Sequence, residues 1–267
     1  MPTLPDKAQP NTVALEVHDL TVSYNKRPVL WGVDFTLPAG ALACIVGPNG
    51  AGKSTLIKAI MGLLPLSSGY AELLGKSLQT VRRQISYVPQ RESVDWDFPI
   101  SVREVVSMGR LARRGLFARS TEADRVAIDQ ALADVDLTAY ANRQISQLSG
   151  GQQQRVFIAR ALAQQPDFFF LDEPFAGVDV ASEAAIVALL KRLSAAGKTV
   201  VVVHHDLQTV PAYFSHAVLL NGRLITAGPV EQVFTNENLA ATYGGKLTIL
   251  SKVAQEAAGR GIDIRKP

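Results

Sequence analysis

The chain has 267 residues and a formal net charge of +3. Its 47% hydrophobic and 19% charged residues exclude a disordered chain, and its 20 glycines and 14 prolines exclude collagen-like and low-complexity classes. Its single cysteine, Cys44, excludes an intramolecular disulfide and a zinc site built from thiolates alone, and it suits a reducing compartment. No run of 18 apolar residues occurs and the N-terminus lacks an apolar stretch, so we expect a soluble or peripheral protein without a signal peptide.

The N-terminal part of the chain alternates strand and helix signals. Apolar runs and period-2 alternation predict strands over 15–24, 30–37, 42–46 and 85–88, and a helix over 54–61 that ends at Gly62. The third of these strands leads directly into a glycine-rich loop. From about residue 91 to 148 strand signals almost vanish. In this stretch Thr121 and Asp124 predict a capping box at the start of a helix that runs through Val135.

Beyond residue 150 the alternation returns. The pattern predicts helices over 150–163 and 181–196 and strands over 168–171, 199–203, 216–220 and 223–227. Asn221-Gly222 between the last two strands indicates a hairpin with a type I′ turn, and Pro229 suits the first position of a short helix. Strands that alternate with helices favour an α/β fold with a mostly parallel sheet, an N-terminal antiparallel β portion and an inserted α-helical subdomain at about 91–148.

Gly47 begins a sequence that matches G-x-x-x-x-G-K-[ST], the phosphate loop of P-loop NTPases, without a gap. An apolar strand precedes it and a helix follows it, which is the context that the motif requires. Its backbone amides would surround the β- and γ-phosphates of ATP, Lys53 would add a charge, and the Ser54 hydroxyl would bind Mg²⁺. A glycine-rich turn that ends in Lys-Ser by chance is the alternative. We assign nucleotide binding to Gly47, Pro48, Asn49, Gly50, Ala51, Gly52, Lys53, Ser54 and the adjacent Thr55.

A second motif ends the apolar strand over 168–171 with Asp172 and Glu173. Carboxylates at the C-terminal end of a buried parallel strand lie where open α/β sheets bind their ligands. Asp172 is the candidate partner of Mg²⁺, and Glu173 is the candidate base that polarises the attacking water. Taken alone, the segment could equally be a strand that ends in a solvated acidic turn. Together with the phosphate loop, it indicates a nucleoside triphosphatase.

Leu148-Ser149-Gly150-Gly151-Gln152 stands at the start of the helix predicted over 150–163. With the two motifs above, this stretch closely resembles the ATP-binding subunit of ABC transporters, and the resemblance extends from about Leu15 to Gly245. It implies an ABC-type ATP-binding domain over 14–245, between an N-terminal tail (1–13) and a C-terminal extension (246–267). It also implies that Ser149, Gly150, Gly151 and Gln152 face the phosphate loop of a second copy, with ATP held between the two.

The resemblance implies roles for further residues. Tyr24 resembles the aromatic residue that stacks on adenine, Gln90 the glutamine that senses Mg²⁺ and the attacking water, and His205 the histidine that contacts the γ-phosphate. Residues 176–179 resemble the loop that meets the partner subunit, and His204 stays ambiguous. The plainer alternatives are strand packing for Tyr24, a simple loop position for Gln90, and an ordinary surface or core histidine for His205.

The family implies an ATPase that couples ATP hydrolysis to transmembrane import, with ATP and Mg²⁺ as cofactors. Residues 88–99 and 204–210 resemble the ATPases of manganese, zinc and iron importers. The implied partners are a second copy of the chain, a multi-span membrane permease and, indirectly, an extracytoplasmic metal-binding protein. The implied location is peripheral, at the cytoplasmic face of the cell membrane. Nucleic acid is not an expected partner, because the positive charge is modest.

Two other function classes stay open. One is a soluble ABC-type ATPase of a non-membrane assembly, such as iron–sulfur cluster building; the other is an ABC protein of DNA repair or translation, which the single copy of each motif disfavours. The remaining features are interpreted structurally. We expect a solvated or interface face at Arg110, Arg113, Arg114 and Arg119, a turn at Asp95-Trp96-Asp97, and a small buried residue at Cys44.

Overall fold

The computed structural model describes residues 13–24, 27–91, 94, 96, 98–114 and 119–244. In this part of the chain the strands form two sheets. An antiparallel sheet has the order β2-β1-β4-β5, made of β1 (Val13–Tyr24), β2 (Arg27–Pro38), β4 (Ser68–Leu73) and β5 (Lys76–Ser77). A larger sheet has the order β10-β9-β3-β8-β7-β6, made of β3 (Leu42–Val46), β6 (Ile85–Val88), β7 (Phe168–Asp172), β8 (Thr199–Val203), β9 (His216–Leu220) and β10 (Leu224–Pro229).

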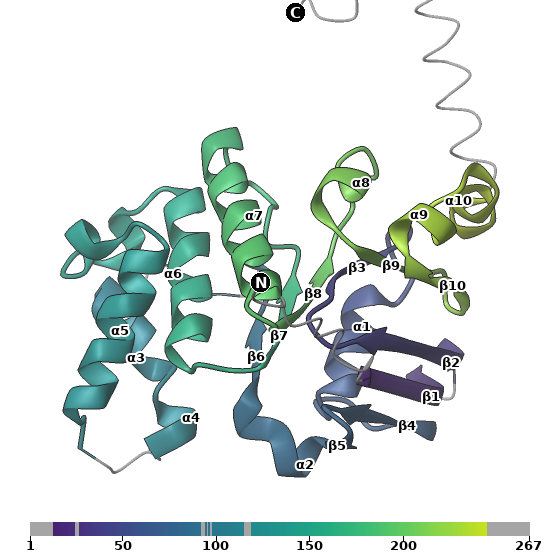
Figure 1. Ribbon diagram of the computed structural model, residues 1–267, viewed down its shortest axis with the longest axis horizontal. Helices are drawn as coiled ribbons and strands as arrows, with labels where there is room; N and C mark the ends of the chain where they lie inside the picture. Colours follow the sequence, from purple (N-terminus) through teal and green to yellow (C-terminus); the bar gives the residue numbers. More distant parts are fainter. Residues whose placement is uncertain are drawn as a thin grey trace, which may run out of the picture.

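Some helices pack against the larger sheet, and others form a separate group at one side of it (Figure 1). They are α1 (Lys53–Ile60), α2 (Leu78–Val81), α3 (Val102–Met108), α4 (Leu111–Arg114), α5 (Glu122–Asp134), α6 (Gly150–Ala163), α7 (Val180–Ala195), α8 (Val210–Tyr213), α9 (Val230–Val233) and α10 (Asn236–Tyr243). Short 3-10 helices cover Arg82–Gln84, Thr138–Tyr140 and Ile145–Gln147. The predicted α/β fold, with a mostly parallel sheet, an N-terminal antiparallel portion and a helical insertion, is confirmed.

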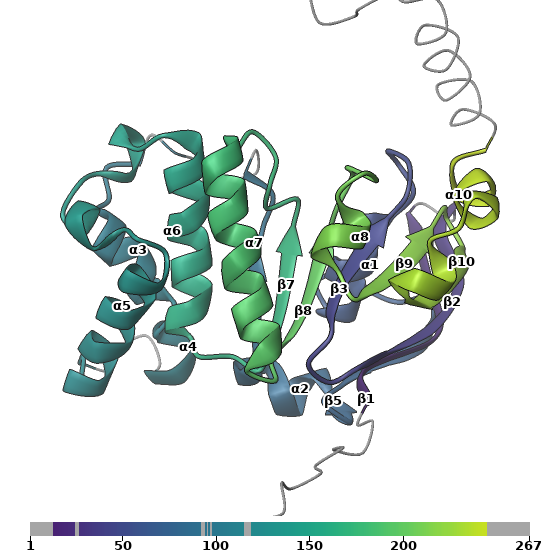
Figure 2. The ribbon, with the colours of Figure 1, turned by 45° about the horizontal axis from the view of Figure 1, so that its top comes forward.

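The larger sheet is covered on both faces. Successive residues of a strand point to opposite sides, so Ala43 and Ile45 of β3 pack with α1 and the antiparallel sheet, whereas Leu42, Cys44 and Val46 pack on the side of α6 and α7. Figure 2 shows α6 and α7 side by side, with α7 next to β7. Burial on both faces explains why β3, β7 and β8 are continuous apolar runs. Cys44 is fully buried, as predicted.

The parallel strands bring distant loops to one edge. Strands β9, β3, β8, β7 and β6 run in the same direction, and β10 is antiparallel to β9. The loops that follow β3, β6, β7 and β8 therefore leave the sheet at the same edge, where open α/β sheets bind ligands. These four loops carry most of the functional residues proposed from the sequence.

Two local expectations need correction, and two strands were not predicted. The strands of the last hairpin are joined by three residues, since Leu224 pairs with Leu220, and only Gly222 of the turn has a positive φ, so the turn is not type I′. Pro229 is the residue before α9 rather than its first residue. The sequence interpretation also missed β4 and β5, because Ser68, Gly69 and Tyr70 are exposed and show no apolar alternation.

Arg110 is not on a solvated face. It is 7% exposed, its Nε donates to Asp124 Oδ1 at 2.7 Å, and its Nη1 donates to the carbonyl oxygen of Ala163 at 2.8 Å. Arg113 also donates, through Nε, to the carbonyl oxygen of Gln164 at 2.8 Å. Because both cations satisfy carbonyl groups at the C-terminal end of α6, where cations are favoured, their role here is structural.

Several sequence expectations lie outside the described residues. They are the N-terminal tail apart from Val13, the C-terminal extension over 246–267, Asp95, Asp97 and the Arg114 side chain. The expected domain boundaries stay predictions. Within the described residues, none of the helices combines the length and the apolar character that crossing a bilayer requires.

Candidate functional site

The phosphate loop connects β3 to α1. Its first glycine, Gly47, cannot carry a side chain, because a Cβ there would lie 2.0 Å from the carbonyl oxygen of Leu220. Gly52, directly before α1, has a φ of 93°, which other residues rarely adopt. The Lys53 ammonium curls back and donates to the carbonyl oxygens of Gly47 at 2.9 Å and Pro48 at 3.0 Å. The loop thus has the shape that the motif predicts.

The turn between β9 and β10 braces this loop. The Gly222 amide donates to the carbonyl oxygen of Ala51 at 2.9 Å, and the Trp31 amide of β2 donates to the carbonyl oxygen of Gly222 at 2.9 Å. In the same turn, Asn221 Nδ2 donates to the carbonyl oxygen of Thr242 in α10 at 2.9 Å. The phosphate loop is therefore held by the β9–β10 turn, which is itself hydrogen-bonded to β2 and α10.

Ser54 and Asp172 meet although they are far apart in the sequence. The Ser54 hydroxyl donates to Asp172 Oδ1 at 3.0 Å, and the Tyr87 hydroxyl donates to Asp172 Oδ2 at 3.4 Å. Burial raises the pKa of Asp172, although the hydrogen bond from Ser54 opposes this shift. Burial also lowers the pKa of Lys53, against the charges of Glu173 and Asp172. Hydroxyl and carboxylate oxygens are the donors that Mg²⁺ prefers, so this pair fits the ion.

Glu173 and Gln90 form a second pair at the same edge. Gln90 Nε2 donates to Glu173 Oε2 at 3.2 Å. Glu173 has a φ of 51°, an unusual value for a residue with a side chain. Such strained backbone is concentrated at functional sites. The structure thus brings the predicted base and the predicted sensing glutamine together.

A cavity of about 440 Å³ lies over the phosphate loop. It is lined by Val29, Asn49, Gly50, Ala51, Gly52, Lys53, Ser54, Thr55, Gln90 and Glu173. The lining thus joins most of the phosphate loop to the Gln90–Glu173 pair. Val29, on β2, was missed by the sequence interpretation, because an apolar residue in a strand gives no sequence signal for a ligand contact.

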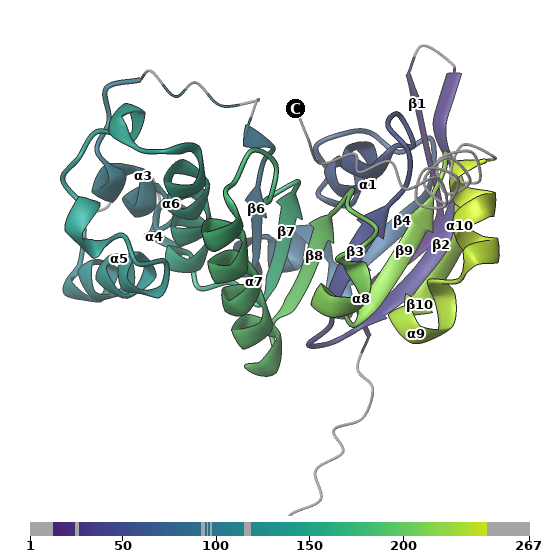
Figure 3. The same cartoon turned by 90° about the horizontal axis from the view of Figure 1, so that it is seen from above.

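The Ser149–Gln152 segment lies elsewhere. Ser149 caps α6: its hydroxyl accepts from the Gln152 amide at 3.3 Å, and Gln152 Oε1 accepts from the Ser149 amide at 3.0 Å. This segment is not among the described residues that line the cavity. Figures 1 and 3 show β6, β7 and β8 between α6 and α1. One copy of the chain therefore does not bring its own Ser149 to its own phosphate loop.

The two histidines after β8 differ. His204 is 2% exposed, its Nε2 is 2.7 Å from Thr209 Oγ1, and its ring packs against Phe175 and Phe214. Burial, with a smaller contribution from the neighbouring His205, lowers the pKa of His204 to about 4. The Thr209 hydroxyl donates to the carbonyl oxygen of Asp206, so it accepts from a neutral His204. His205 is exposed at the ligand edge.

Tyr24 is 47% exposed at the end of β1 and is not among the described residues that line the cavity.

Residues that the sequence interpretation left without a role also reach the site. Tyr87 contacts Asp172, and Arg91 contacts the first turn of α6. An aromatic residue in a strand and an arginine in a loop carry no sequence signal for such contacts.

Comparison with known proteins agrees with this geometry. Residues 30–176 match the ABC transporter family. The manganese transport system ATP-binding protein MntB of Bacillus subtilis is 57% identical over 236 residues, 88% of this chain and 94% of that protein. The zinc transport system ATP-binding protein TroB of Treponema pallidum is 53% identical over 235 residues, 88% of each chain.

Solved structures give the same result. CbiO1 from Clostridium perfringens, part of the transporter complex CbiONQ, superposes with a TM-score of 0.74 at 28% identity, covering 91% of this chain and 99% of that one. The dimeric ATP-binding cassette MJ0796 bound to ADP and Pi superposes with a TM-score of 0.71 at 30% identity, covering 81% of this chain and 98% of that one. From its motifs, its fold and these relatives, the chain belongs to the ABC transporter family, as an ATP-binding subunit.

Proposed function

We propose that this chain binds and hydrolyses ATP to power an importer of manganese, zinc or iron. The observation that carries the cargo class is the 57% and 53% identity to subunits of manganese and zinc transport systems. A role in a non-membrane assembly such as iron–sulfur cluster building is not favoured, because these relatives are parts of transport systems. The cargo would bind other subunits: among the described residues, no three His, Cys, Asp or Glu side chains are grouped so that they could hold a metal ion.

In this proposal, Ser54 and Asp172 hold Mg²⁺ beside the phosphate loop, with Gln90 as a further ligand. When bound, the ion supplies charge neutralisation to the β- and γ-phosphates. Lys53 leaves its carbonyl partners and adds a charge-assisted hydrogen bond to the same phosphates. Glu173 polarises the attacking water, Gln90 orients it, and His205 contacts the γ-phosphate. Tyr24 stacks on adenine from the end of β1.

The second copy completes the site. Ser149, Gly150, Gly151 and Gln152 of one copy face the phosphate loop of the other, and residues 176–179 lie at the same interface. The supporting observation is that, among the described residues, the first turn of α6 does not line the chain's own cavity, while helix N-termini stabilise anions such as the γ-phosphate. The dimeric cassette bound to ADP and Pi supports this arrangement.

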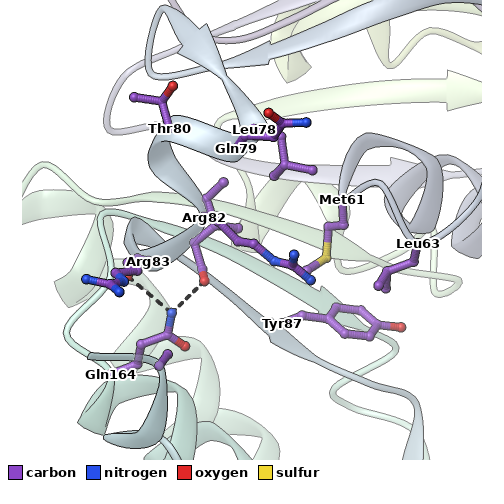
Figure 4. A pocket seen from close by; sticks show the side chains of 11 residues that line it. Met61, Leu63, Leu78, Gln79, Thr80, Arg82, Arg83, Tyr87 and Gln164 are labelled. Atoms are coloured by element: carbon purple, nitrogen blue, oxygen red, sulfur yellow. Dashed lines mark hydrogen bonds between the residues drawn. The ribbon is translucent and has the colours of Figure 1, made fainter. Parts of the chain in front are cut away.

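A membrane permease would dock on a groove next to the helical group. This groove of about 760 Å³ is lined by Met61, Leu63, Leu78, Gln79, Thr80, Arg82, Arg83, Ile85, Tyr87, Ala112 and Gln164. In Figure 4, Met61, Leu63 and Tyr87 lie on one side and Arg83 and Gln164 on the other, with Arg82 between them. Apolar and basic side chains together suit a short amphipathic helix with an acidic residue. The chain would then sit on the cytoplasmic face of the membrane, in contact with an extracytoplasmic metal-binding protein only through the permease.

The composite site is tested with a mixed pair of variants. Ser149→Asp keeps a good helix cap and adds a negative charge where the partner's γ-phosphate would lie. Lys53→Met removes the phosphate-binding charge and keeps most of the side-chain volume. A dimer with one variant in each copy retains one intact site, whereas each variant alone damages both sites.

Enriched mixed dimers should therefore hold about one ATP per pair, and either homodimer should hold less at the same ATP concentration. Nucleotide occupancy is the quantity to measure, because hydrolysis can require two intact sites. Equal occupancy in all three pairs would contradict the composite arrangement. The transport role is tested separately by tagging the chain in cells and identifying what copurifies: a multi-span membrane protein is expected, and a soluble assembly alone would refute the proposal.

A further inference from the structure

Arg91 lies between the nucleotide cavity and the first turn of α6. It follows Gln90, whose side chain bonds to Glu173 at the nucleotide cavity. The Arg91 side chain is directed instead toward α6, where its Nη2 donates to Gln153 Oε1 at 2.9 Å. Gln153 is 5% exposed, and its own Nε2 donates to the carbonyl oxygen of Ile145 at 3.1 Å. Two consecutive residues therefore connect the cavity with the helix that begins at the Ser149 cap.

The guanidinium group also lies beside two glycines, Gly150 and Gly177, that would face the second copy in the proposed dimer. A Cβ built on Gly150 would lie 3.4 Å from Arg91 Cζ and 3.3 Å from the carbonyl oxygen of Gly177. A Cβ built on Gly177 would lie 4.0 Å from Arg91 Nη1. The Arg91 head thus sits where the first turn of α6 meets the 176–179 loop. A shift of Arg91 would change the packing where these two segments meet.

Trp96 fixes this arginine at both ends. Trp96 Nε1 donates to the carbonyl oxygen of Arg91 at 2.9 Å, and its ring lies 5.5 Å from Arg91 Cζ in a cation–π contact. The same ring packs edge-on against Phe157 of α6, with centroids 5.0 Å apart. Because backbone and head group are both held, Arg91 can transmit a displacement rather than absorb it through free rotation of its side chain.

The charge of Arg91 lies beside the first turn of α6, where the carboxylate of Asp179 also approaches: a Cβ built on Gly151 would lie 2.9 Å from Asp179 Oδ2. The N-terminus of a helix carries a partial positive charge, and the first turn of α6 has no acidic residue. Within the described part of the chain, no carboxylate forms an ion pair with Arg91. An anion that arrives at Ser149 and Gly150 would be attracted by the helix N-terminus and by the Arg91 charge beside it. In the proposed dimer that anion is the γ-phosphate held by the other copy.

We propose that Arg91 is a positioning residue that couples the two nucleotide sites of the dimer: it ties the Gln90–Glu173 pair of one site to the Ser149–Gly150 segment and Gly177 that the same copy presents at the other site. The proposal rests on the composite arrangement argued above. Each copy would then contain a rigid link between its two nucleotide contacts. Through this link, the nucleotide at a copy's own phosphate loop alters how tightly the Ser149–Gly150 segment of the same copy binds the nucleotide held by the partner.

The test compares Arg91→Gln and Arg91→Lys with Arg143→Gln. Arg143 is the matched control, because it also stacks on an aromatic ring, Tyr140 at 5.0 Å, but is not bonded to Gln153. ADP affinity of the monomer and ATP-driven dimerisation are measured for each purified full-length variant, the first by titration calorimetry and the second by analytical ultracentrifugation with a slowly hydrolysed ATP analogue.

Arg91→Gln should keep the ADP affinity of wild type and weaken ATP-driven dimerisation at least about fivefold, the lower end of the usual range for coupled sites. Arg91→Lys should recover part of the loss through its charge, and Arg143→Gln should behave like wild type. A third readout is the emission of Trp96 in a Trp31→Phe background, where it is the only tryptophan. The change that the ATP analogue produces in wild type should be lost with Arg91→Gln.

Two results would overturn the inference. One is unchanged dimerisation of Arg91→Gln; the other is an equal loss of ADP affinity, dimerisation and thermal stability, which indicates a structural role only. Failure of the wild-type chain to dimerise with the ATP analogue would instead refute the composite site itself, so the two failures are distinguishable.

Discussion

Tyr87 donates a hydrogen bond from its hydroxyl to Oδ2 of Asp172 at 3.4 Å, and the same side chain lines the groove of Figure 4. A single residue thus touches both the proposed Mg²⁺ partner and the proposed permease surface. The hydrogen bond also opposes the rise in the pKa of Asp172 that burial causes, so it favours the ionised carboxylate.

Tyr87→Phe should therefore weaken Mg²⁺ binding in the presence of ATP. Loss of one hydrogen bond of about 1 kcal/mol predicts about a fivefold higher Mg²⁺ concentration for half-maximal ATPase activity. Tyr70→Phe is the control, because Tyr70 is exposed on β4 and stacks on His18. An unchanged Mg²⁺ dependence would mean that the Tyr87 hydroxyl does not support Asp172.

Glu173→Gln should retain ATP binding and slow hydrolysis by about 10²–10⁴-fold, the usual effect of losing a general base. The new amide oxygen can still accept the hydrogen bond from Gln90, so the local geometry should persist. Phosphate release measures the rate, and size-exclusion chromatography with ATP and Mg²⁺ should show an accumulated dimer. Hydrolysis at a near-normal rate would remove Glu173 from this role.

Lys53→Met should lower ATP affinity by about 10- to 100-fold, because a charge-assisted hydrogen bond of about 1.5–3 kcal/mol is lost. Lys53 is 7% exposed, so the apolar replacement is chosen to fill the same space. Circular dichroism should show an unchanged fold, and fluorescence titration should show the weaker binding. Wild-type affinity would exclude Lys53 as a phosphate ligand.

His204 should make the fold sensitive to acid. Its pKa is about 4 in the folded protein against 6.5 for an ordinary histidine, so between these values the unfolded chain binds a proton that the folded chain does not. Stability from this residue is therefore complete above pH 6.5 and declines as the pH falls, by about 3 kcal/mol at pH 4. Urea unfolding at pH 7.5, 5.5 and 4 measures the loss.

The matched variant is His204→Gln, whose amide can still donate to Thr209 but does not titrate. The free energy of unfolding of this variant should fall less between pH 7.5 and pH 4 than that of wild type. Parallel pH profiles for the two proteins would show that His204 already takes up its proton in the folded state.

The sequence was informative where function and local structure coincide. The phosphate loop, the β7 end and the Thr121–Asp124 capping box of α5 were predictable because each consists of neighbouring residues whose types determine a loop, a strand end or a helix start. The contacts of Arg91 with Gln153 and of Tyr87 with Asp172 were not, because each joins segments more than 60 residues apart whose approach depends on the packing of whole elements. Arg110 was misread for the same reason, since its carbonyl partner on Ala163 is 53 residues away.

The hydrogen bonds from the Gly222 turn to Ala51 and from Trp31 to the same turn leave the phosphate loop little freedom to rearrange. A phosphate loop that is already ordered loses little conformational entropy when a ligand binds to it. It also offers the same surface to ADP and to ATP. In the proposed dimer, the segments that follow β6, β7 and β8 and the second copy would therefore supply the contacts that change when ADP replaces ATP, while the phosphate loop keeps its shape.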